Sequence, residues 1–396
     1  MTVFNGARDG YQVPLALAEA GRLEALVTDW YSPLDRRGFA RALAFAPERV
    51  RSALARRRHA DLPSRLVRTM PWQAVRQRVR PDTLSDVDAR LGGAAGELAR
   101  ARGAGLLAYS YYAHAAFAAL GTAAGARVLF QVQAHPAALR RVFVDEASPD
   151  DYDAGSGADG APRPLAEWPR RVGLADEPFM ADRCVAPSTY VRTTLVDAGV
   201  APDRVSVVPY GVDLDTFNPS APSTVRRPFR VVYAGQLLRR KGLQYLLAAW
   251  KRLALPNAEL LLVGRGASDG PLLRAYAGLY RVVRDVHARA AMARIYAESD
   301  VCCLPSLSDA FGHVLLEALA CGTPVIGTVN TAAPDLVTPG ENGFVVPIRD
   351  VDALLRTLTW CYENPDALAH MRAAARRRAE QCSWGAFRRA LVACVD

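Results

Sequence analysis

Short apolar runs alternate with amphipathic segments along most of this chain, and that alternation limits the folds it can adopt. The runs are rich in Val and Leu and are often continuous rather than alternating in polarity. Such runs are typical of strands in a parallel sheet that helices cover on both faces. Between them lie helical patterns; from 243 to 253, apolar residues recur at 243, 246, 247, 250 and 253. The predicted strands cover 23–29, 105–110, 127–135, 183–188, 205–211, 230–235, 259–264, 300–306, 323–328 and 343–348, after a very short first strand.

A break in this alternation predicts two domains. The chain has 396 residues, more than one ordinary domain needs. The break, at 217–228, contains three prolines and several small polar residues. We predict an α/β chain of two doubly wound, Rossmann-like domains, over 1–216 and 229–375, joined by that linker. We expect 376–396 to form a helix that packs back on the N-terminal domain.

Positive charge is concentrated in one region. The formal net charge is +9, and thirteen arginines lie between Arg36 and Arg80 with only Glu48 and Asp61 opposing them, so this region carries 13 − 2 = +11. Three interpretations stay open: a solvated helical face, a site for an anionic acceptor, or a contact with a membrane surface. Nucleic acid is not expected, because no aromatic interleaving or nucleic-acid motif accompanies the arginines.

The cysteines and the start of the chain indicate the compartment. None of the seven cysteines forms a Cys-x-x-Cys pair or lies near a His at zinc-finger spacing, which is typical of reduced, cytosolic usage. The first residues lack the apolar core of a signal peptide. The uncharged window 103–126 fits a strand and a helix better than a membrane span. We expect a cytoplasmic protein, with peripheral contact at the inner face of the membrane as an option.

The most informative segment runs from 306 to 326. A predicted strand ends, a loop with Asp309 follows, Gly312 opens a helix, and Glu317 lies in that helix among six apolar neighbours. A lone carboxylate in such surroundings is costly to bury without a partner. The partner is either an internal Arg or Lys, or the hydroxyls of a ligand, as when an acidic residue binds ribose in dinucleotide-binding folds.

This segment resembles the E-x7-E signature of retaining glycosyltransferases of family 4, which have the GT-B fold. Asp309 stands where the first Glu usually is, and Glu317 matches the second. The resemblance implies that the first carboxylate holds hydroxyls of the donor sugar and that the second holds the ribose. It also implies that backbone N–H groups near Phe311, Gly312 and His313 face sugar and phosphate. The Asp side chain is one methylene shorter than Glu. This difference leaves the identity of the donor sugar undecided, but it does not affect the predicted fold.

A second segment places cations where a strand leads into a helix. The strand ends at Gly235, and Lys241 stands just before the helix, whose N-terminus offers unpaired N–H groups and partial positive charge to phosphate. Without the family, the alternative for this segment is a plain strand, turn and helix whose basic residues are solvated. In the family, an Arg and a Lys five residues apart hold the leaving diphosphate. Lys241 matches the Lys, whereas Gln236 occupies the Arg position; Arg239 and Arg240 are candidate replacements.

Two further donor-side positions come from the same resemblance. Gly264 and Arg265 follow the predicted strand 259–264 and would border the base and the ribose. His135 ends the predicted strand 127–135, where the family has a His near the donor sugar. Without the family, a hydrogen-bonded His at a strand end explains it equally well.

The acceptor is expected on the first domain. Arg8, Asp9, Tyr11 and Gln12 follow the first strand and occupy the loop that faces the cleft in GT-B proteins. Tyr109 is a candidate for stacking on a sugar, with core packing as the alternative.

No cofactor and no metal are predicted. Asp213 and Asp215 form an Asp-x-Asp pair, but similar short spacings recur at 86, 151 and 350, so the pair is near chance. Family members generally do not need a bound metal for catalysis.

The sequence thus predicts a retaining glycosyltransferase that moves a sugar from a nucleotide-diphosphate-sugar donor to an acceptor. The acceptor is a glycan, a lipid-linked intermediate or a small molecule, which suggests polysaccharide, cell-envelope or glycoconjugate biosynthesis. Two alternatives remain open: a GT-B nucleotide-sugar epimerase, and a catalytically weak GT-B subunit of a glycan-assembly complex.

Overall fold

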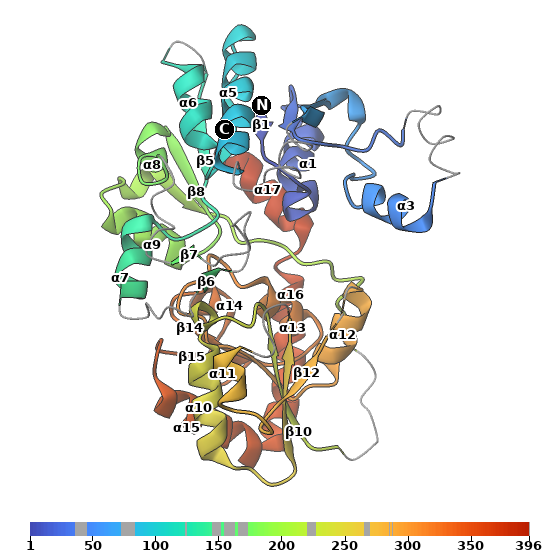
Figure 1. Ribbon diagram of the computed structural model, residues 1–396, viewed down its shortest axis with the longest axis vertical. Coiled ribbons are helices and arrows are strands. Elements are labelled where there is room, and N and C mark those ends of the chain that lie inside the picture. The colour runs from blue at the N-terminus through green and yellow to red at the C-terminus, as the bar shows by residue number, and fades with distance from the viewer. Residues whose placement is uncertain are drawn as a thin grey trace.

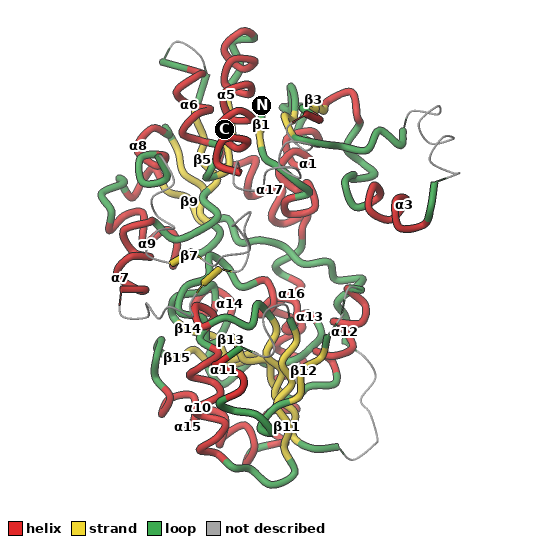
Figure 2. The backbone as a smooth tube through the Cα atoms, viewed as in Figure 1, coloured by secondary structure: helices red, strands yellow, loops and turns green. Residues whose placement is uncertain are grey.

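The protein folds around two separate parallel sheets, each with helices on its faces (Figures 1 and 2). The computed structural model describes residues 1–35, 46–72, 84–122, 125–144, 152–153, 163–164, 173–219, 227–264, 270–284, 286 and 288–395. The α/β class predicted from the alternation of runs is therefore confirmed. Within the described parts, no helix is long and apolar enough to cross a bilayer.

The first sheet has seven strands in the order β3-β2-β1-β4-β5-β8-β9, and every neighbouring pair is parallel. The strands are β1 (Thr2–Val3), β2 (Leu26–Thr28), β3 (Val67–Thr69), β4 (Leu106–Tyr109), β5 (Arg127–Phe130), β8 (Arg183–Ala186) and β9 (Val205–Val207). The chain winds outward from β1 to β3 and then returns to β4, so the winding direction reverses between β1 and β4. In open α/β sheets, ligands bind at the carboxyl ends of the strands at such a reversal.

Helices around the first sheet pack closely where small residues allow it. They are α1 (Gln12–Glu19), α3 (Glu48–Ala55), α5 (Leu84–Ala101), α6 (Ala113–Leu120), α7 (Pro136–Phe143), α8 (Glu177–Met180) and α9 (Thr189–Asp197). A side chain at Gly96 of α5 would place its Cβ 2.2 Å from the carbonyl oxygen of Ala116 in α6. The two helices can approach this closely only because position 96 is a glycine. A small antiparallel pair, β6 (Tyr152–Asp153) and β7 (Arg163–Pro164), lies outside the main sheets.

The second sheet has six strands in the order β12-β11-β10-β13-β14-β15, again all parallel. The strands are β10 (Phe229–Ala234), β11 (Ala258–Val263), β12 (Arg281–Val283), β13 (Val301–Leu304), β14 (Val325–Thr328) and β15 (Gly343–Val346). The helices are α10 (Leu243–Leu253), α11 (Pro271–Arg274), α12 (Arg289–Ala297), α13 (His313–Ala320), α14 (Ala333–Leu336), α15 (Val351–Glu363) and α16 (Pro365–Glu380). Here the winding reverses between β10 and β13.

Each strand predicted from an apolar run overlaps an observed strand, and most begin within a residue of it. The runs 23–29 and 323–328 begin three and two residues before β2 and β14, and several predicted strands extend beyond the observed ones. The run 127–135 predicts a strand up to His135, but β5 ends at Phe130 and the chain continues as a loop. In the two main sheets, β3 and β12 were not predicted, and both lie at an edge of their sheet. The predicted linker at 217–228 lies partly outside the described residues, so its limits stay a prediction.

The last helix, α17 (Trp384–Val395), returns to the first sheet, where it lies beside α1 (Figure 1). Arg388 of α17 donates one hydrogen bond to Gln12 at 2.7 Å and another to Glu19 at 2.8 Å. Just before this helix, the carbonyl oxygen of Cys382 accepts a hydrogen bond from the N–H of Val212 at 2.9 Å. The two stretches that connect the sheets therefore run side by side.

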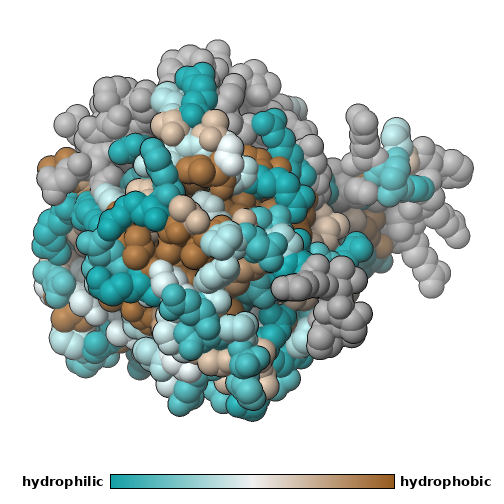
Figure 3. All heavy atoms as spheres, turned by 90° about the horizontal axis from the view of Figure 1, so that it is seen from below, coloured by the Kyte–Doolittle hydropathy of each residue, from teal (hydrophilic) through white to brown (hydrophobic). Residues whose placement is uncertain are grey.

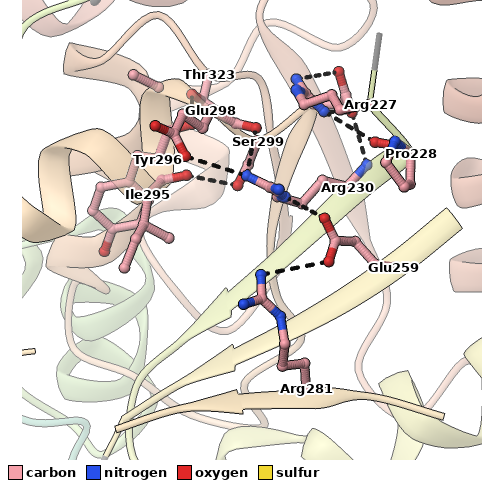
Figure 4. Close-up of polar contacts among 12 residues, drawn as sticks. Arg227, Pro228, Arg230, Glu259, Arg281, Ile295, Tyr296, Glu298, Ser299 and Thr323 are labelled. Carbon is pink, nitrogen blue, oxygen red and sulfur yellow. Dashed lines mark hydrogen bonds and ion pairs between the residues drawn. The ribbon is translucent and has the colours of Figure 1, made fainter. Parts of the chain in front are cut away.

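Charged side chains tie the amino ends of the second sheet together (Figure 4). Arg227 donates two hydrogen bonds to Asp300, at 2.6 and 3.0 Å. Arg230 at the start of β10 donates to Glu259 at 2.6 Å, and Arg281 lies 3.5 Å from the other oxygen of Glu259. These contacts join β10, β11 and β12 at the edge opposite the carboxyl ends, so they belong to the scaffold. Seen from below the view of Figure 1, hydrophobic residues lie in the middle of the face and hydrophilic residues surround them (Figure 3).

All seven cysteines are free thiols, and six of them are buried. Burial raises the pKa of Cys302 and Cys303 in β13 well above the ordinary value. Thiols in this state are inert packing groups.

Candidate functional site

The candidate site lies where the second sheet reverses its winding, at the carboxyl ends of β10, β11 and β13. Gly235 follows β10 and Gly264 follows β11, and their backbones approach closely. A Cβ at Gly264 would lie only 1.6 Å from the carbonyl oxygen of Gly235, so a side chain is excluded there. Two of the predicted donor-side positions are thus required as glycines by the backbone itself. Arg265, predicted beside them, lies outside the described residues.

Lys241 is fixed in this region by the turn that follows it. Gly242 adopts a left-handed conformation with φ of 71°, and a Cβ there would lie 1.8 Å from the carbonyl oxygen of Pro305. The start of α10 therefore lies against the loop after β13. Across this contact, the ammonium of Lys241 forms a hydrogen-bonded ion pair with Asp309, and the two side chains are only 13% and 21% exposed. Lys241 and Asp309, both predicted as catalytic, are brought into direct contact.

Asp309 is held on its other side by the backbone that leads into α13. One carboxylate oxygen accepts hydrogen bonds from the N–H groups of Gly312 at 3.1 Å and Phe311 at 3.4 Å. Burial acts to raise the pKa of Asp309, but the charge and hydrogen bond of Lys241, together with the charge of Arg240 and the N–H of Phe311, hold that pKa below the ordinary value. Burial also lowers the pKa of Lys241, against the attraction of Asp309. We therefore treat Asp309 as ionised, with Lys241 as its counter-ion.

Glu317 lies one turn further along α13 and has few compensating contacts. The hydroxyl of Tyr296 donates a hydrogen bond to it at 3.1 Å. Burial raises the pKa of Glu317 to about 7, and Tyr296 and the charge of Arg289 only partly oppose this. The partner that the sequence left open is therefore a tyrosine hydroxyl rather than a directly paired cation. A carboxyl group in this state has room for further hydrogen bonds from a ligand.

Arg289, the first residue of α12, belongs to the same neighbourhood. Its charge acts on both Glu317 and His313. Its guanidinium lies 3.5 Å from Asp213 and 5.1 Å from the centre of the Phe217 ring. Neither Arg289 nor Tyr296 was predicted from the sequence, since neither stands in a recognisable motif.

In the first domain, a cluster of polar side chains lies where the winding of the sheet reverses, between β1 and β4. Tyr109, at the end of β4, donates a hydrogen bond to Asp9 at 2.8 Å. Asp9 itself has a left-handed backbone with φ of 49°, and strained residues of this kind cluster at functional sites. The guanidinium of Arg8 lies 5.5 Å from the centre of the Tyr109 ring. These three acceptor-side candidates are therefore brought together.

Asp9 also reaches the second domain electrostatically. Burial raises its pKa, and among the opposing charges His313 at the start of α13 acts most strongly. Burial correspondingly lowers the pKa of the His313 ring, although that residue still has solvent-exposed surface. The loop after β1 and the start of α13 thus face each other between the two sheets.

Two of the acceptor-side candidates have structural partners instead. Tyr11 is buried, and its ring lies 5.7 Å from Phe4 and 5.3 Å from Tyr31, so it belongs to the core of the first domain. Gln12 accepts the hydrogen bond from Arg388 of α17.

Tyr210 is a central residue that the sequence did not single out. Its ring lies 4.6 Å from His313, 5.4 Å from Phe311 and 5.7 Å from Phe387 of α17. It stands in the stretch that leads from the first sheet to the second. The start of α13 therefore packs against the connection between the domains.

His135 is held by backbone groups on both ring nitrogens. Nδ1 accepts the N–H of Ala137 at 3.2 Å and so caps α7, while Nε2 lies 3.3 Å from the carbonyl oxygen of Ala175. The residue is 5% exposed. Among the described residues, no contact links it to Lys241 or Asp309. These bonds favour a structural role, and the catalytic role of His135 stays a prediction.

The sequence of this region matches a known family. Residues 228–364 fit the pattern described as "Glycosyl transferases group 1". This match covers most of the second domain. It contains Lys241, Asp309 and Glu317, although their individual roles stay predictions.

Relatives with known names match about half of the chain. The MMP alpha-(1->4)-mannosyltransferase of Mycolicibacterium hassiacum is 33% identical over 210 residues, which is 51% of this chain and 50% of that protein. The D-inositol 3-phosphate glycosyltransferase of Pseudarthrobacter chlorophenolicus is 31% identical over 236 residues, 54% of this chain and 56% of that protein. The chain thus spans about half the length of the curated relatives it matches.

Solved structures extend the likeness to the fold of both domains. Sucrose-phosphate synthase from Thermosynechococcus elongatus gives a TM-score of 0.64 at 21% identity, covering 95% of this chain and 89% of that one. Anabaena HepE in complex with UDP-glucose gives 0.63 at 17% identity, covering 99% and 98%. At these identities the likeness concerns the fold alone. The two domains thus adopt the predicted GT-B arrangement of Rossmann-like domains.

Proposed function

We propose that this protein is a retaining glycosyltransferase that moves a sugar from a nucleotide-diphosphate-sugar donor to an acceptor. The observation that carries the proposal is the pairing of Lys241 with Asp309 at the reversal point of the second sheet, one helical turn from the under-compensated Glu317. Both features lie inside the part of the chain that matches group 1 glycosyl transferases. Two solved structures of similar fold, both of Anabaena HepE, are complexes with UDP-glucose and with UDP and glucose.

In this proposal the second domain binds the donor. Lys241 and the N–H groups at the start of α13 lie where a diphosphate would find positive charge, and such preorganised donors stabilise the charge that grows on a leaving group. Glu317 would accept hydrogen bonds from the ribose hydroxyls, which its single tyrosine contact leaves room for. Asp309 would hold hydroxyls of the sugar. We assign no metal and no cofactor to this reaction.

The acceptor is assigned to the first domain. Arg8, Asp9 and Tyr109 face the start of α13, so an acceptor hydroxyl held there would lie near the donor sugar. The cationic character of Arg8 suits an anionic acceptor. A lipid-linked or polysaccharide intermediate fits this description, and biosynthesis of polysaccharide, cell envelope or glycoconjugates follows from it.

The arginine-rich region suggests where such an acceptor is met. Its described part, 46–72, exposes Arg51, Arg56, Arg65 and Arg68 to solvent. The same part exposes Trp72 to 81% and Val50 to 44%. Exposed aromatic and apolar side chains among cations fit the interface of an anionic membrane. We therefore propose peripheral contact with an anionic bilayer; the rest of the region lies outside the described residues.

The catalytic proposal is tested by nucleotide release. The protein is incubated with a panel of UDP-, GDP-, ADP- and TDP-sugars, with and without lipid-linked and soluble glycan acceptors. We expect release of nucleoside diphosphate that depends on an acceptor, with the anomeric configuration of the donor kept in the product. Turnover without an acceptor that yields an epimerised donor would replace this proposal with an epimerase. Binding without any turnover on the panel would reduce the protein to a binding subunit.

The membrane proposal is tested by sedimentation with vesicles. We expect binding to phosphatidylcholine vesicles that contain phosphatidylglycerol, little binding to phosphatidylcholine alone, and release by added salt. Trp72→Ala should weaken the binding, whereas Phe179→Ala, a matched exposed aromatic on α8, should not. Equal binding to both vesicle types would refute an electrostatic contact.

A further inference from the structure

The loop between β10 and α10 holds two side chains in a fixed relation. The hydroxyl of Tyr233 donates a hydrogen bond to the carbonyl oxygen of Gln236, which anchors the start of the loop. The N–H of Leu307 donates to the carbonyl oxygen of Arg240 at 3.1 Å, which anchors its end to the loop after β13. Between these anchors, the guanidinium of Arg240 donates a hydrogen bond to the side-chain oxygen of Gln236.

Arg240 carries positive charge that the surrounding groups do not neutralise. The neighbouring Lys241 is matched by Asp309, whose carboxylate is also occupied by backbone N–H groups. In the part of the chain that the structure describes, no carboxylate lies within ion-pair distance of Arg240. Its Nε is buried and has no hydrogen-bond acceptor. Two cations against one carboxylate leave a surplus of +1 at this point.

The surplus charge lies beside the Lys241–Asp309 pair. The charge of Arg240 contributes to the low pKa of Asp309 and to that of Lys241. Gln236, which fixes the guanidinium, is a neutral residue that remains exposed. The exposed amide of Gln236 holds one terminal nitrogen of the guanidinium in place, which leaves the other N–H groups of the fork for an incoming anion. Arginine is suited to this because its planar fork matches two phosphate oxygens.

We infer that Arg240 binds the diphosphate of the nucleotide directly and that Gln236 is its positioning residue. The inference rests on the proposed function, because it names a further group that holds the same donor. In this arrangement the second cation of the diphosphate site stands four residues after the position at which the sequence predicts it. Gln236 orients this cation and does not contact the phosphate.

The test is calorimetric titration of UDP and GDP, each compared with its monophosphate. In Arg240→Ala, we expect the affinity for the preferred diphosphate to fall about tenfold to a hundredfold, as for the loss of one charge-assisted hydrogen-bonded contact. The affinity for the monophosphate should fall less. Arg252→Ala removes an exposed arginine of α10 that pairs with Asp352 and should leave both affinities unchanged. Urea unfolding of each variant verifies that the second domain remains folded.

A second substitution makes the inference specific. In the Arg240→Ala background, Gln236→Arg places a guanidinium beside the same point and should restore at least tenfold of the lost diphosphate affinity. Gln236→Ala alone should weaken binding less than Arg240→Ala, since the cation is still present but less ordered. Wild-type affinity in Arg240→Ala, or equal losses for diphosphate and monophosphate, would overturn the inference.

The failure of this inference is distinguishable from failure of the proposed function. If Lys241→Ala loses diphosphate affinity and Arg240→Ala does not, the donor site stands and Arg240 has no part in it. If the wild-type protein binds no nucleotide of the panel, the proposed function fails together with the inference.

Discussion

Replacing Glu317 by Gln should make the protein more stable at alkaline pH and leave it unchanged at acidic pH. Burial raises the pKa of this carboxyl group from 4.5 to about 7. Between these two values the native protein binds more protons than the unfolded chain, so stability falls as the pH rises. The difference of about 2.5 pKa units, at about 1.4 kcal/mol per unit, corresponds to about 3 kcal/mol above pH 7. Gln stays neutral throughout and keeps an oxygen for the Tyr296 hydroxyl.

The assay is urea unfolding of wild-type protein and Glu317→Gln at a series of pH values from about 4 to about 8.5, a range that spans both pKa values. The useful quantity is the difference in the free energy of unfolding between the two proteins at each pH. Subtraction is necessary because other groups titrate as well; burial raises the pKa of Glu177 to about 8, for example. We expect the difference to be near zero at about pH 4 and to grow to about 3 kcal/mol in favour of the variant by about pH 8.

Two outcomes would refute the reasoning about Glu317. A difference that does not change with pH would mean that its carboxyl group titrates alike in both states. A variant that loses stability as the pH rises would mean that the native state favours the ionised form. Glu177→Gln provides a matched control, since its own pKa shift should give a similar difference centred at higher pH.

Three further predictions concern the site and the scaffold. Asp309→Asn releases Lys241 from its counter-ion, so nucleoside diphosphate affinity measured by calorimetry should rise up to about tenfold while sugar transfer falls; weaker diphosphate binding would contradict this. Gly96→Ala forces a Cβ against α6 and should lower the free energy of unfolding by about 1–3 kcal/mol. Gly93→Ala in the same helix meets open space and should raise it by about 1 kcal/mol, and equal effects of the two changes would refute the packing argument. Arg388→Ala should cost about 1 kcal/mol or less in urea unfolding, because its partners are partly exposed, and a much larger loss would mean that α17 holds the domains together mainly through this residue.

The fold could be predicted because buried parallel strands leave a strong pattern. Runs such as 259–264 are apolar at nearly every position. A strand of this kind is buried on both faces, as in a parallel sheet that helices cover on both sides. The two strands of the main sheets that escaped prediction, β3 and β12, have three residues each, and each contains an arginine. Edge strands are covered on fewer sides and tolerate charge, so the pattern is weakest there.

The site could be predicted only in the part that local sequence determines. Lys241 and Asp309 stand next to strand ends, and parallel strands bring their carboxyl ends to one edge, so their meeting follows from order along the chain. Tyr296 and Arg289 reach Glu317 from another helix. Which residues of α12 face α13 depends on how the two helices pack against each other. The local sequence pattern does not predict this packing.

His135 and Tyr210 illustrate opposite consequences of the same limit. His135 ends a predicted strand, but the strand stops five residues earlier and the ring then caps a helix, so its position in the sequence did not reveal its surroundings. Tyr210 has no motif, yet it contacts the start of α13 and the returning helix α17 together. A movement of one domain against the other must therefore disturb the ring contacts of Tyr210 with His313 or with Phe387. Asp9 of the first domain also acts electrostatically on His313, so a domain movement would change both this charge interaction and the ring contact of His313 with Tyr210.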